Sequence, residues 1–207
     1  YSVKKSGDAT ALLVGFPSTG KSTLLNRITN AESKVGDYDF TTLNVVPGVL
    51  EYNGAKIQVL DIPGIIEGVS GGRGRGKEVL SVVRSADLVL IMVSADRAER
   101  QLGVIEKELY ASGFRLNKNP PDIKITRKST GGIKISSTVK QDLSNETIRS
   151  MMNAFGIINA EVLVREKLTE DMVVDSLIKS RVYVPAFVII NKIDLVANPR
   201  VNTGLDG

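Results

Sequence analysis

The glycines, the lysine and the serine of one short segment have the spacing needed to surround phosphate groups. Gly15-Phe16-Pro17-Ser18-Thr19-Gly20-Lys21-Ser22 fits the pattern G-x-x-x-x-G-K-[ST]. Glycines let backbone N–H groups approach phosphate oxygens, Lys21 can place a positive charge at the β- and γ-phosphates, and the Ser22 hydroxyl can bind Mg²⁺. The expected nucleotide-binding residues here are Gly15, Pro17, Ser18, Thr19, Gly20, Lys21, Ser22 and Thr23.

A chance glycine-rich turn is the alternative interpretation of this segment. The phosphate-binding motif requires a strand before the loop and a helix after it. The apolar run Ala11–Val14 predicts the strand, and the apolar spacing of Leu24–Ile28 predicts the helix. The context therefore favours the phosphate loop.

Two later segments could complete a site for Mg²⁺ and the γ-phosphate. A threonine in Asp39-Phe40-Thr41-Thr42-Leu43 could bind Mg²⁺ from a loop that orders with the triphosphate and relaxes after hydrolysis. Asp61-Ile62-Pro63-Gly64 follows an apolar run, so Asp61 could hold a Mg²⁺-bound water and Gly64 could donate its N–H to the γ-phosphate. Turn hydroxyls and an ordinary Pro-Gly turn are the alternatives, and the order of the segments favours the site.

The segment Asn191-Lys192-Ile193-Asp194 has the residue types that recognise guanine. It follows the apolar run Ala186–Ile190, and open α/β sheets bind ligands at the carboxyl ends of their strands. The Asp194 carboxylate can accept hydrogen bonds from N1–H and the 2-amino group of guanine, whereas adenine would leave it unpaired. Asn191 can bond near purine N7 and O6, and the Lys192 stem can lie over the ring. An ATP-using enzyme is therefore disfavoured.

The composition excludes several other kinds of site. The 207 residues contain no histidine and no cysteine, which rules out Ser–His triads, His or thiolate zinc sites, cysteine nucleophiles and disulfides within this chain. The chain has no stretch of about 18 apolar residues, so we expect no membrane contact and a cytoplasmic location. The net charge of +4 fits a solvated surface as well as an acidic partner.

The apolar patterns between the motifs predict an α/β core interrupted by a second domain. Asn53-Gly54 between two apolar runs predicts a hairpin, and Leu88–Val93 predicts a strand buried on both faces of a parallel sheet. The pattern of Ala98–Ser112 predicts a helix that ends at Gly113.

Residues 114–181 have a different pattern, and lysines and arginines are concentrated in their first part. These are Arg115, Lys118, Lys124, Arg127, Lys128 and Lys134. Isoleucines alternate with polar residues on both sides of Gly131-Gly132, which predicts a hairpin with one solvated face. A helix capped by Ser144, a strand at Glu161–Arg165 and a helix opened by Thr169 complete the order ββαβα. The basic hairpin could meet RNA phosphates or could be a charged solvated face, since no aromatic residues interleave to stack bases.

The ordered motifs resemble the Obg branch of the translation-factor-related GTPases. The segments that carry this resemblance are Gly15–Ser22, Phe40–Leu43, Asp61–Gly68 and Asn191–Asp194. Further segments resemble more specifically the developmentally regulated GTP-binding protein (DRG) family of archaea and eukaryotes, namely Phe114–Lys118, Thr130–Lys134, Asn159–Val162 and Arg181–Pro185. The resemblance covers nearly the whole chain, including residues 114–181.

The DRG resemblance implies a three-layer, Ras-like P-loop GTPase core in residues 1–113 and 182–207, with a small inserted α+β domain of order ββαβα at residues 114–181. Such a core should continue after Asp194 with a helix, a strand and a loop over the base. Instead, Asn202–Gly207 resembles the segment that comes after that loop in the family. We therefore expect residues to be missing between about Val196 and Asn202, and the GTPase domain to be incomplete at its C-terminus.

The resemblance also implies roles for single residues. Thr42, the second of its pair, corresponds to the threonine that binds Mg²⁺ together with Ser22, while Asp61 acts through water. We expect Lys21, Thr42 and Gly64 to act in catalysis. Ile65 stands where many GTPases have the glutamine that orients the attacking water, which implies slow intrinsic hydrolysis.

The resemblance implies GTP or GDP and Mg²⁺ as ligands and the ribosome or RNA as partner. Some relatives bind potassium through an asparagine of the phosphate loop; Ser18 holds that place here, so potassium stays an open expectation. The glycine- and arginine-rich tract 70–76 could be a linker or a switch that follows the nucleotide. The main hypothesis is a slow GTP-hydrolysing switch, open to a regulatory partner protein. The alternative is an RNA- or ribosome-binding module whose nucleotide site mainly sets conformation.

Overall fold

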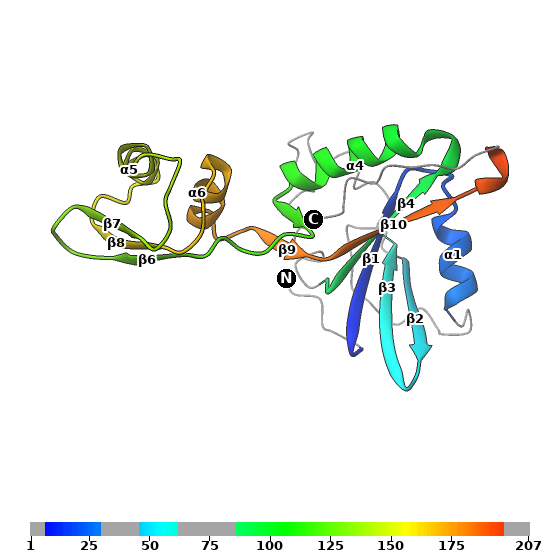
Figure 1. Cartoon of the computed structure of the whole chain (residues 1–207). Helices are drawn as coiled ribbons and strands as arrows, with labels where there is room; N and C mark the ends of the chain where they lie inside the picture. Colours follow the sequence, from blue (N-terminus) through cyan, green and yellow to red (C-terminus); the bar gives the residue numbers. More distant parts are fainter. Residues whose placement is uncertain (1–6, 30–45, 62–85, 197–207) are drawn as a thin grey trace. The chain divides into compact units, whose positions relative to one another are not determined.

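The computed structural model of the chain describes residues 7–29, 46–61 and 86–196 (Figure 1). The residues fall into two compact units. The first runs up to Lys118 and resumes at Val182, and the second is Asn119–Arg181. Within the described part of the chain, no helix is long and apolar enough to cross a membrane. The expected missing residues between Val196 and Asn202 lie outside the described residues.

The first unit is built on a five-stranded sheet of order β10-β4-β1-β3-β2. Strands β1 (Ala9–Gly15), β3 (Ala55–Asp61), β4 (Leu88–Ser94) and β10 (Ala186–Asn191) are parallel to one another, and the edge strand β2 (Val46–Tyr52) is antiparallel to β3. This arrangement confirms the predicted α/β core. The carboxyl ends of the parallel strands meet at one edge of the sheet. The phosphate loop, the Asp61–Gly64 segment and the guanine motif each start there, at Gly15, Asp61 and Asn191.

The predicted hairpin at Asn53-Gly54 is confirmed. The two residues have φ angles of 49° and 82°, and they join the antiparallel pair of β2 and β3. Positive φ at both central positions of a two-residue loop matches the twist of the flanking strands, and Asn-Gly adopts it at low cost. The hairpin therefore follows from local turn chemistry.

Apolar residues alternate to both faces of the sheet and make three layers. One face, with Leu12 and Val14 fully buried, packs with α4 (Ala98–Ala111), which follows the short 3₁₀ turn η1 (Ala95–Arg97). The other face, with Leu13 fully buried, packs with Leu25 of α1 (Lys21–Ile28). Period-two alternation on strands buried on both sides explains why their sequences read as continuous apolar runs.

The boundary of the second unit differs from the sequence expectation. Phe114 is 2% exposed in the core of the first unit, and β5 (Phe114–Leu116) pairs in parallel with β9 (Val182–Val184). Asn117 continues this pairing through its side chain, which accepts from Ala186 N at 2.7 Å and donates to Ala186 O at 3.1 Å. Residues 114–118, assigned to the insert from composition, thus belong to the first unit because Phe114 fills its core.

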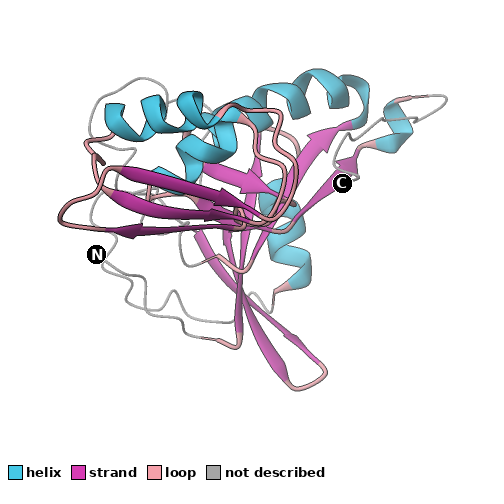
Figure 2. Ribbon diagram, turned by 60° about the vertical axis from the view of Figure 1, so that its left-hand side comes forward, coloured by secondary structure: helices cyan, strands magenta, loops and turns pink. Residues whose placement is uncertain are grey.

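The second unit, called the insert from here on, has the element order ββαβα. Its elements are β6 (Ile123–Arg127), β7 (Ile133–Ser137), α5 (Asn145–Ala154), β8 (Ala160–Val164) and α6 (Glu170–Leu177). Ser144 and Thr169 cap the two helices, accepting from Thr147 N at 3.0 Å and Met172 N at 3.3 Å. Both helices pack with the same side of the sheet (Figure 2).

The hairpin expected around Gly131-Gly132 is wrong. The sheet order is β6-β8-β7, with β8 antiparallel to β6 and parallel to β7. The central strand is the most apolar of the three: Ala160, Val162 and Val164 are 0–2% exposed. Burial favours the central position for β8, because a central strand is covered by a neighbour on each side. The alternation of apolar and polar residues in β6 and β7 does not indicate which strand lies between them.

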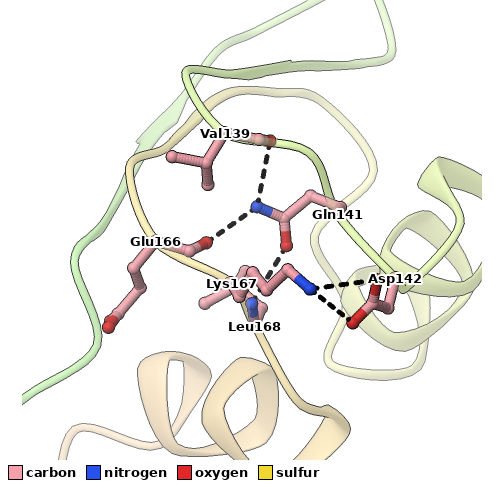
Figure 3. Close-up of polar contacts among 6 residues, drawn as sticks. All are labelled: Val139, Gln141, Asp142, Glu166, Lys167 and Leu168. Atoms are coloured by element: carbon pink, nitrogen blue, oxygen red, sulfur yellow. Dashed lines mark hydrogen bonds and ion pairs between the residues drawn. The ribbon is translucent and has the colours of Figure 1, made fainter.

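One glutamine joins the two connections that lead into the helices of the insert. Gln141 Nε2 donates to the Glu166 carbonyl at 2.7 Å, and its Oε1 accepts from Leu168 N at 3.0 Å (Figure 3). Next to it, an exposed ion pair joins Lys167 Nζ to Asp142 at 3.0 Å. These bonds join residues that are 25–27 positions apart in the sequence, so they hold the two connections of the insert together.

Candidate nucleotide-binding site

The phosphate loop lies between β1 and α1, as its motif predicts. Gly20 has φ 100° at the N-cap of α1, and Ser18 has φ 61°. The first turn of α1 has no acidic residue and, among the described residues, no side-chain cap. Its first N–H groups and the positive end of the helix dipole are therefore available to a phosphate.

Lys21 is held over this loop by the loop's own carbonyl groups. Its Nζ donates to Gly15 O at 2.9 Å and to Phe16 O at 3.0 Å. An ammonium group has three donors, so one remains for a phosphate oxygen. The side chain of Thr19, 1% exposed, donates to Phe16 O at 2.9 Å and closes the loop from inside.

The two motif glycines have steric reasons to be glycine. A Cβ on Gly15 would lie 2.4 Å from the Met92 carbonyl oxygen of the neighbouring strand. A Cβ on Gly20 would lie 2.3 Å from Asn191 Nδ2, at a φ that side chains rarely adopt. Sequence reasoning missed the Met92 contact, since a backbone carbonyl leaves no signature in residue types.

The guanine motif lies directly beside the phosphate loop. Asn191 ends β10, and its Nδ2 donates to the Thr19 carbonyl at 2.8 Å across 172 residues of sequence. The sequence suggested only a role at the purine edge for Asn191, so this tie is an additional finding. The second N–H and the oxygen of the amide remain for a ligand.

The other residues of the guanine motif follow in a short turn. Lys192 is half-buried with φ 58°, and it precedes the 3₁₀ turn η2 (Ile193–Leu195). Asp194 is exposed in that turn. The left-handed residue redirects the chain at the strand end, so the carboxylate sits on a loop rather than in the sheet.

Asp61 carries a buried carboxylate with an unused oxygen. The residue is 5% exposed at the end of β3, opposite Leu13 of β1, and its Oδ1 has no hydrogen-bond partner among the described residues. Burial raises the pKa of Asp61 above its ordinary value, and the Lys21 ammonium partly opposes this rise. A bound cation or its water would satisfy this oxygen.

The donor set at the loop fits Mg²⁺. The described residues contain no group of three or more acidic, histidine or cysteine side chains that could chelate a metal on its own. Mg²⁺ in phosphate sites takes one or two protein ligands and completes its shell with phosphates and water. The exposed hydroxyl of Ser22 and the orphaned oxygen of Asp61 match that requirement.

Some of the remaining predicted site residues lie at the phosphate loop, and the others lie outside the described residues. Pro17, Ser18 and Thr23 are exposed at the loop and the start of α1, where a ligand can reach them. Thr42, Gly64, Ile65 and the tract 70–76 lie outside the described residues. Their assigned roles stay predictions.

Two family models match the chain. The model described as "50S ribosome-binding GTPase" matches residues 10–128, and the model described as "C-terminal region of MMR_HSR1 domain" matches residues 130–204. The first match covers the phosphate loop and Asp61, and the second covers most of the insert together with Asn191–Asp194.

Relatives with similar sequences carry GTP-binding names. An uncharacterized GTP-binding protein of Methanocaldococcus jannaschii is 57% identical over 196 residues, 94% of this chain and 50% of that protein. Ribosome-interacting GTPase 1 of Saccharomyces cerevisiae is 48% identical, covering 94% of this chain and 53% of that protein. Developmentally-regulated GTP-binding protein 2 of Homo sapiens is 45% identical, covering 98% and 56%.

The chain spans about half the length of the curated relatives it matches. The matches cover 94–98% of this chain. This chain therefore belongs to the developmentally regulated GTP-binding protein (DRG) family of Obg-like GTPases.

Proposed function

We propose that the chain is a guanine-nucleotide switch that hydrolyses GTP slowly and works in association with the ribosome. The observation that carries the nucleotide part is the 2.8 Å hydrogen bond from Asn191 Nδ2 to the Thr19 carbonyl. It keeps the guanine motif beside the phosphate loop, and one nucleotide must reach both. A break of this tie would separate base recognition from phosphate recognition.

Asp194 gives the preference for guanine. Its carboxylate accepts from N1–H and the 2-amino group, and an adenine ring would leave a charged acceptor unpaired. The aliphatic stem of Lys192 covers the ring, and the second N–H of Asn191 reaches the N7 and O6 edge.

The phosphates are bound by charge and by backbone N–H groups. Lys21 and the first turn of α1 stabilise the negative charge that develops on the β- and γ-phosphates. Ser22 and Thr42 would ligate Mg²⁺ directly and Asp61 through a water, and the metal would neutralise charge between the two phosphates.

Hydrolysis is slow because no evident side chain activates the water. Asp61 is assigned to the metal, Lys21 is a cation, and Ile65 has no group that could orient a water. Water positioning is left to backbone groups of Thr42 and Gly64 or to a partner protein.

The ribosome is proposed as a partner because a relative at 48% identity is named a ribosome-interacting GTPase. The insert favours a second candidate function, an RNA- or ribosome-binding module whose nucleotide site mainly sets conformation. The lysine- and arginine-rich segment of the insert, residues 123–141, lies in a compact unit that has its own apolar core.

Competition among GTP, GDP and ATP for a fluorescent guanine nucleotide tests the proposal. We expect GTP and GDP to compete, ATP to be weaker by about 100-fold or more, and turnover at saturating Mg²⁺ to stay well below about one per second. Equal competition by ATP would overturn the guanine assignment. Fast hydrolysis without a partner would overturn the slow switch.

A further inference from the structure

The insert has one sheet face that its helices leave uncovered. Helices α5 and α6 pack on the side of Ile133, Val162 and Val164 (Figure 2). Alternation sends the intervening side chains to the other side. The residues of this open face are Lys124, Thr126, Lys134, Ser136, Glu161 and Leu163. Together with Val162 of the central strand, they line a hollow of about 410 Å³.

The strand registers arrange these side chains in two rows. Thr126, Glu161 and Lys134 lie across the sheet in one row, and Lys124, Leu163 and Ser136 lie in the other. The two lysines thus occupy opposite corners, on the outer strands. Two strand spacings across the sheet and two residues along it separate these positions, so the backbones of the two lysines lie roughly 12 Å apart along the diagonal.

The charges of the open face are not balanced. Lys128 Nζ lies 3.1 Å from the Glu161 carboxylate and offsets the only acid of the face. Within the described part of the chain, no ion pair involves Lys124 or Lys134. Elsewhere in the insert, Arg165, Lys167 and Arg181 are paired with aspartates.

The surrounding sequence adds to this positive charge. Residues 123–141 contain five lysines and arginines and no acid. The face therefore attracts an anion, and its chemistry limits which one. Lysines bind phosphates as point charges, and the hydroxyls of Thr126 and Ser136 can donate to a phosphate or exchange hydrogen bonds with a ribose 2′-OH.

We propose that the open face of the insert binds the sugar–phosphate backbone of double-helical RNA. The face has no aromatic side chain on which an unpaired base could stack, and single-stranded RNA is read mainly by such stacking. Helical RNA is recognised through phosphates and 2′-hydroxyls, which are the groups this face can bind. The inference rests on the proposed ribosome association and identifies the surface responsible.

The test measures binding of a fluorescent 20-base-pair RNA duplex to the complete 207-residue chain by anisotropy over a salt series. We expect the double variant Lys124→Ala/Lys134→Ala to bind at least about tenfold more weakly at low salt, with a salt slope smaller by about one per lysine. Lys140→Ala, the matched control, removes a nearby exposed cation that does not line the hollow and should change binding less than about twofold.

A second variant separates RNA from other anions. Thr126→Val/Ser136→Ala removes the hydroxyls and leaves the lysines, so it should reduce the preference for duplex RNA over duplex DNA of the same sequence. Binding of both nucleic acids unchanged in the lysine variant would overturn the inference. Equal competition by a polyglutamate peptide of matched charge would overturn it in favour of an acidic protein.

Binding of a fluorescent guanine nucleotide in the same samples distinguishes the two proposals. We expect all four proteins to bind it alike, since none of the substitutions lies at the nucleotide site. A chain that binds guanine nucleotide but no duplex RNA at low salt overturns the RNA face alone. A chain that binds the duplex but no guanine nucleotide overturns the switch alone.

Discussion

The first unit and the insert place their polar chemistry in different ways. In the first unit, the proposed phosphate site consists mostly of backbone groups in loops at the carboxyl ends of parallel strands, as the left-handed Gly20 and the uncapped start of α1 indicate. In the insert, the polar groups are side chains on a sheet face, and they meet only through the registers of β8 with β6 and β7.

This difference explains why one site has a sequence motif and the other has none. A backbone site constrains each position through φ or through close contact, so few residue types fit and the pattern is recognisable. A sheet face needs only a charge or a hydroxyl at alternate positions, which many solvated strands also have. Substitutions in the two units test this contrast, from the largest expected effect to the smallest.

Asp194→Asn should give the largest effect in the first unit. The amide cannot supply the charged acceptor for N1–H and the 2-amino group, so we expect GTP affinity to fall by about 100-fold. Xanthosine triphosphate has an oxygen in place of the 2-amino group and should bind the variant better than it binds the wild-type protein. Titration with both nucleotides measures this, and unchanged GTP affinity would contradict the guanine assignment.

Gly15→Ala tests the dependence of the phosphate loop on backbone contact. The new Cβ would lie 2.4 Å from the Met92 carbonyl oxygen, and the strands must shift to admit it. We expect the free energy of unfolding to fall by about 2 kcal/mol, together with weaker nucleotide binding. Urea denaturation measures the first effect.

Gly103→Ala is the matched control. A Cβ there meets no described atom within 4 Å, and the position is inside α4. We expect this helix substitution to raise the free energy of unfolding by about 0.5–1 kcal/mol. A loss of similar size in both variants would show that the Met92 contact has no special role.

Gln141→Ala should affect the insert and spare the nucleotide site. It leaves Leu168 N and Glu166 O without their 3.0 Å and 2.7 Å partners, so we expect the insert to lose about 1–2 kcal/mol of stability. Hydrogen exchange of insert amides measures this, and GTP affinity should not change. Lys167→Ala removes only an exposed ion pair and should cost less than about 1 kcal/mol.

Asp61→Asn should give the smallest and most conditional effect on stability. Because burial raises the Asp61 pKa, the ionised carboxylate opposes folding at neutral pH, and this penalty fades as the pH falls below the raised pKa. Without Mg²⁺ and nucleotide, we expect the variant to be slightly more stable at pH 7 than the wild-type protein, with the gain shrinking in acid. Urea denaturation of both proteins at pH 7 and at an acidic pH measures the sign of the stability difference.

The same Asp61→Asn variant should bind GTP less well in Mg²⁺ and about as well in its absence. The buried Asp61 oxygen without a hydrogen-bond partner, Oδ1, is the atom that we assign to a water bound to Mg²⁺. Equal Mg²⁺ dependence in both proteins would contradict that assignment.

Much of the first unit could be predicted from the sequence. The hairpin at Asn53-Gly54, the apolar strand predicted at Leu88–Val93 and the helix that ends before Gly113 all follow from local patterns, and all are present. The phosphate loop was recognisable because Gly15, Gly20 and Lys21 each have a single role in a short segment. Local chemistry and the global fold agree in this unit.

The insert was predicted in its element order and missed in its topology. The two outer strands alternate as hairpin strands do, and nothing in residues 123–137 indicates that β8 lies between them. Phe114 was assigned to the insert by composition, although its burial places it in the first unit. In both cases the deciding contact involves residues far apart in the chain, which a local pattern cannot report.

By itself, the sequence determined which residue types are available for ligand binding. From them it predicts phosphate binding at Gly15–Ser22, guanine recognition at Asp194 and, from Ile65, a slow reaction. Only the tertiary structure decided that Asn191 ties the base motif to the phosphate loop and that Lys124 and Lys134 share one sheet face. Residue types specify which groups a site can offer. Long-range pairing decides which of these groups meet, because the free energy of burying β8 and β10 depends on neighbours from the whole chain.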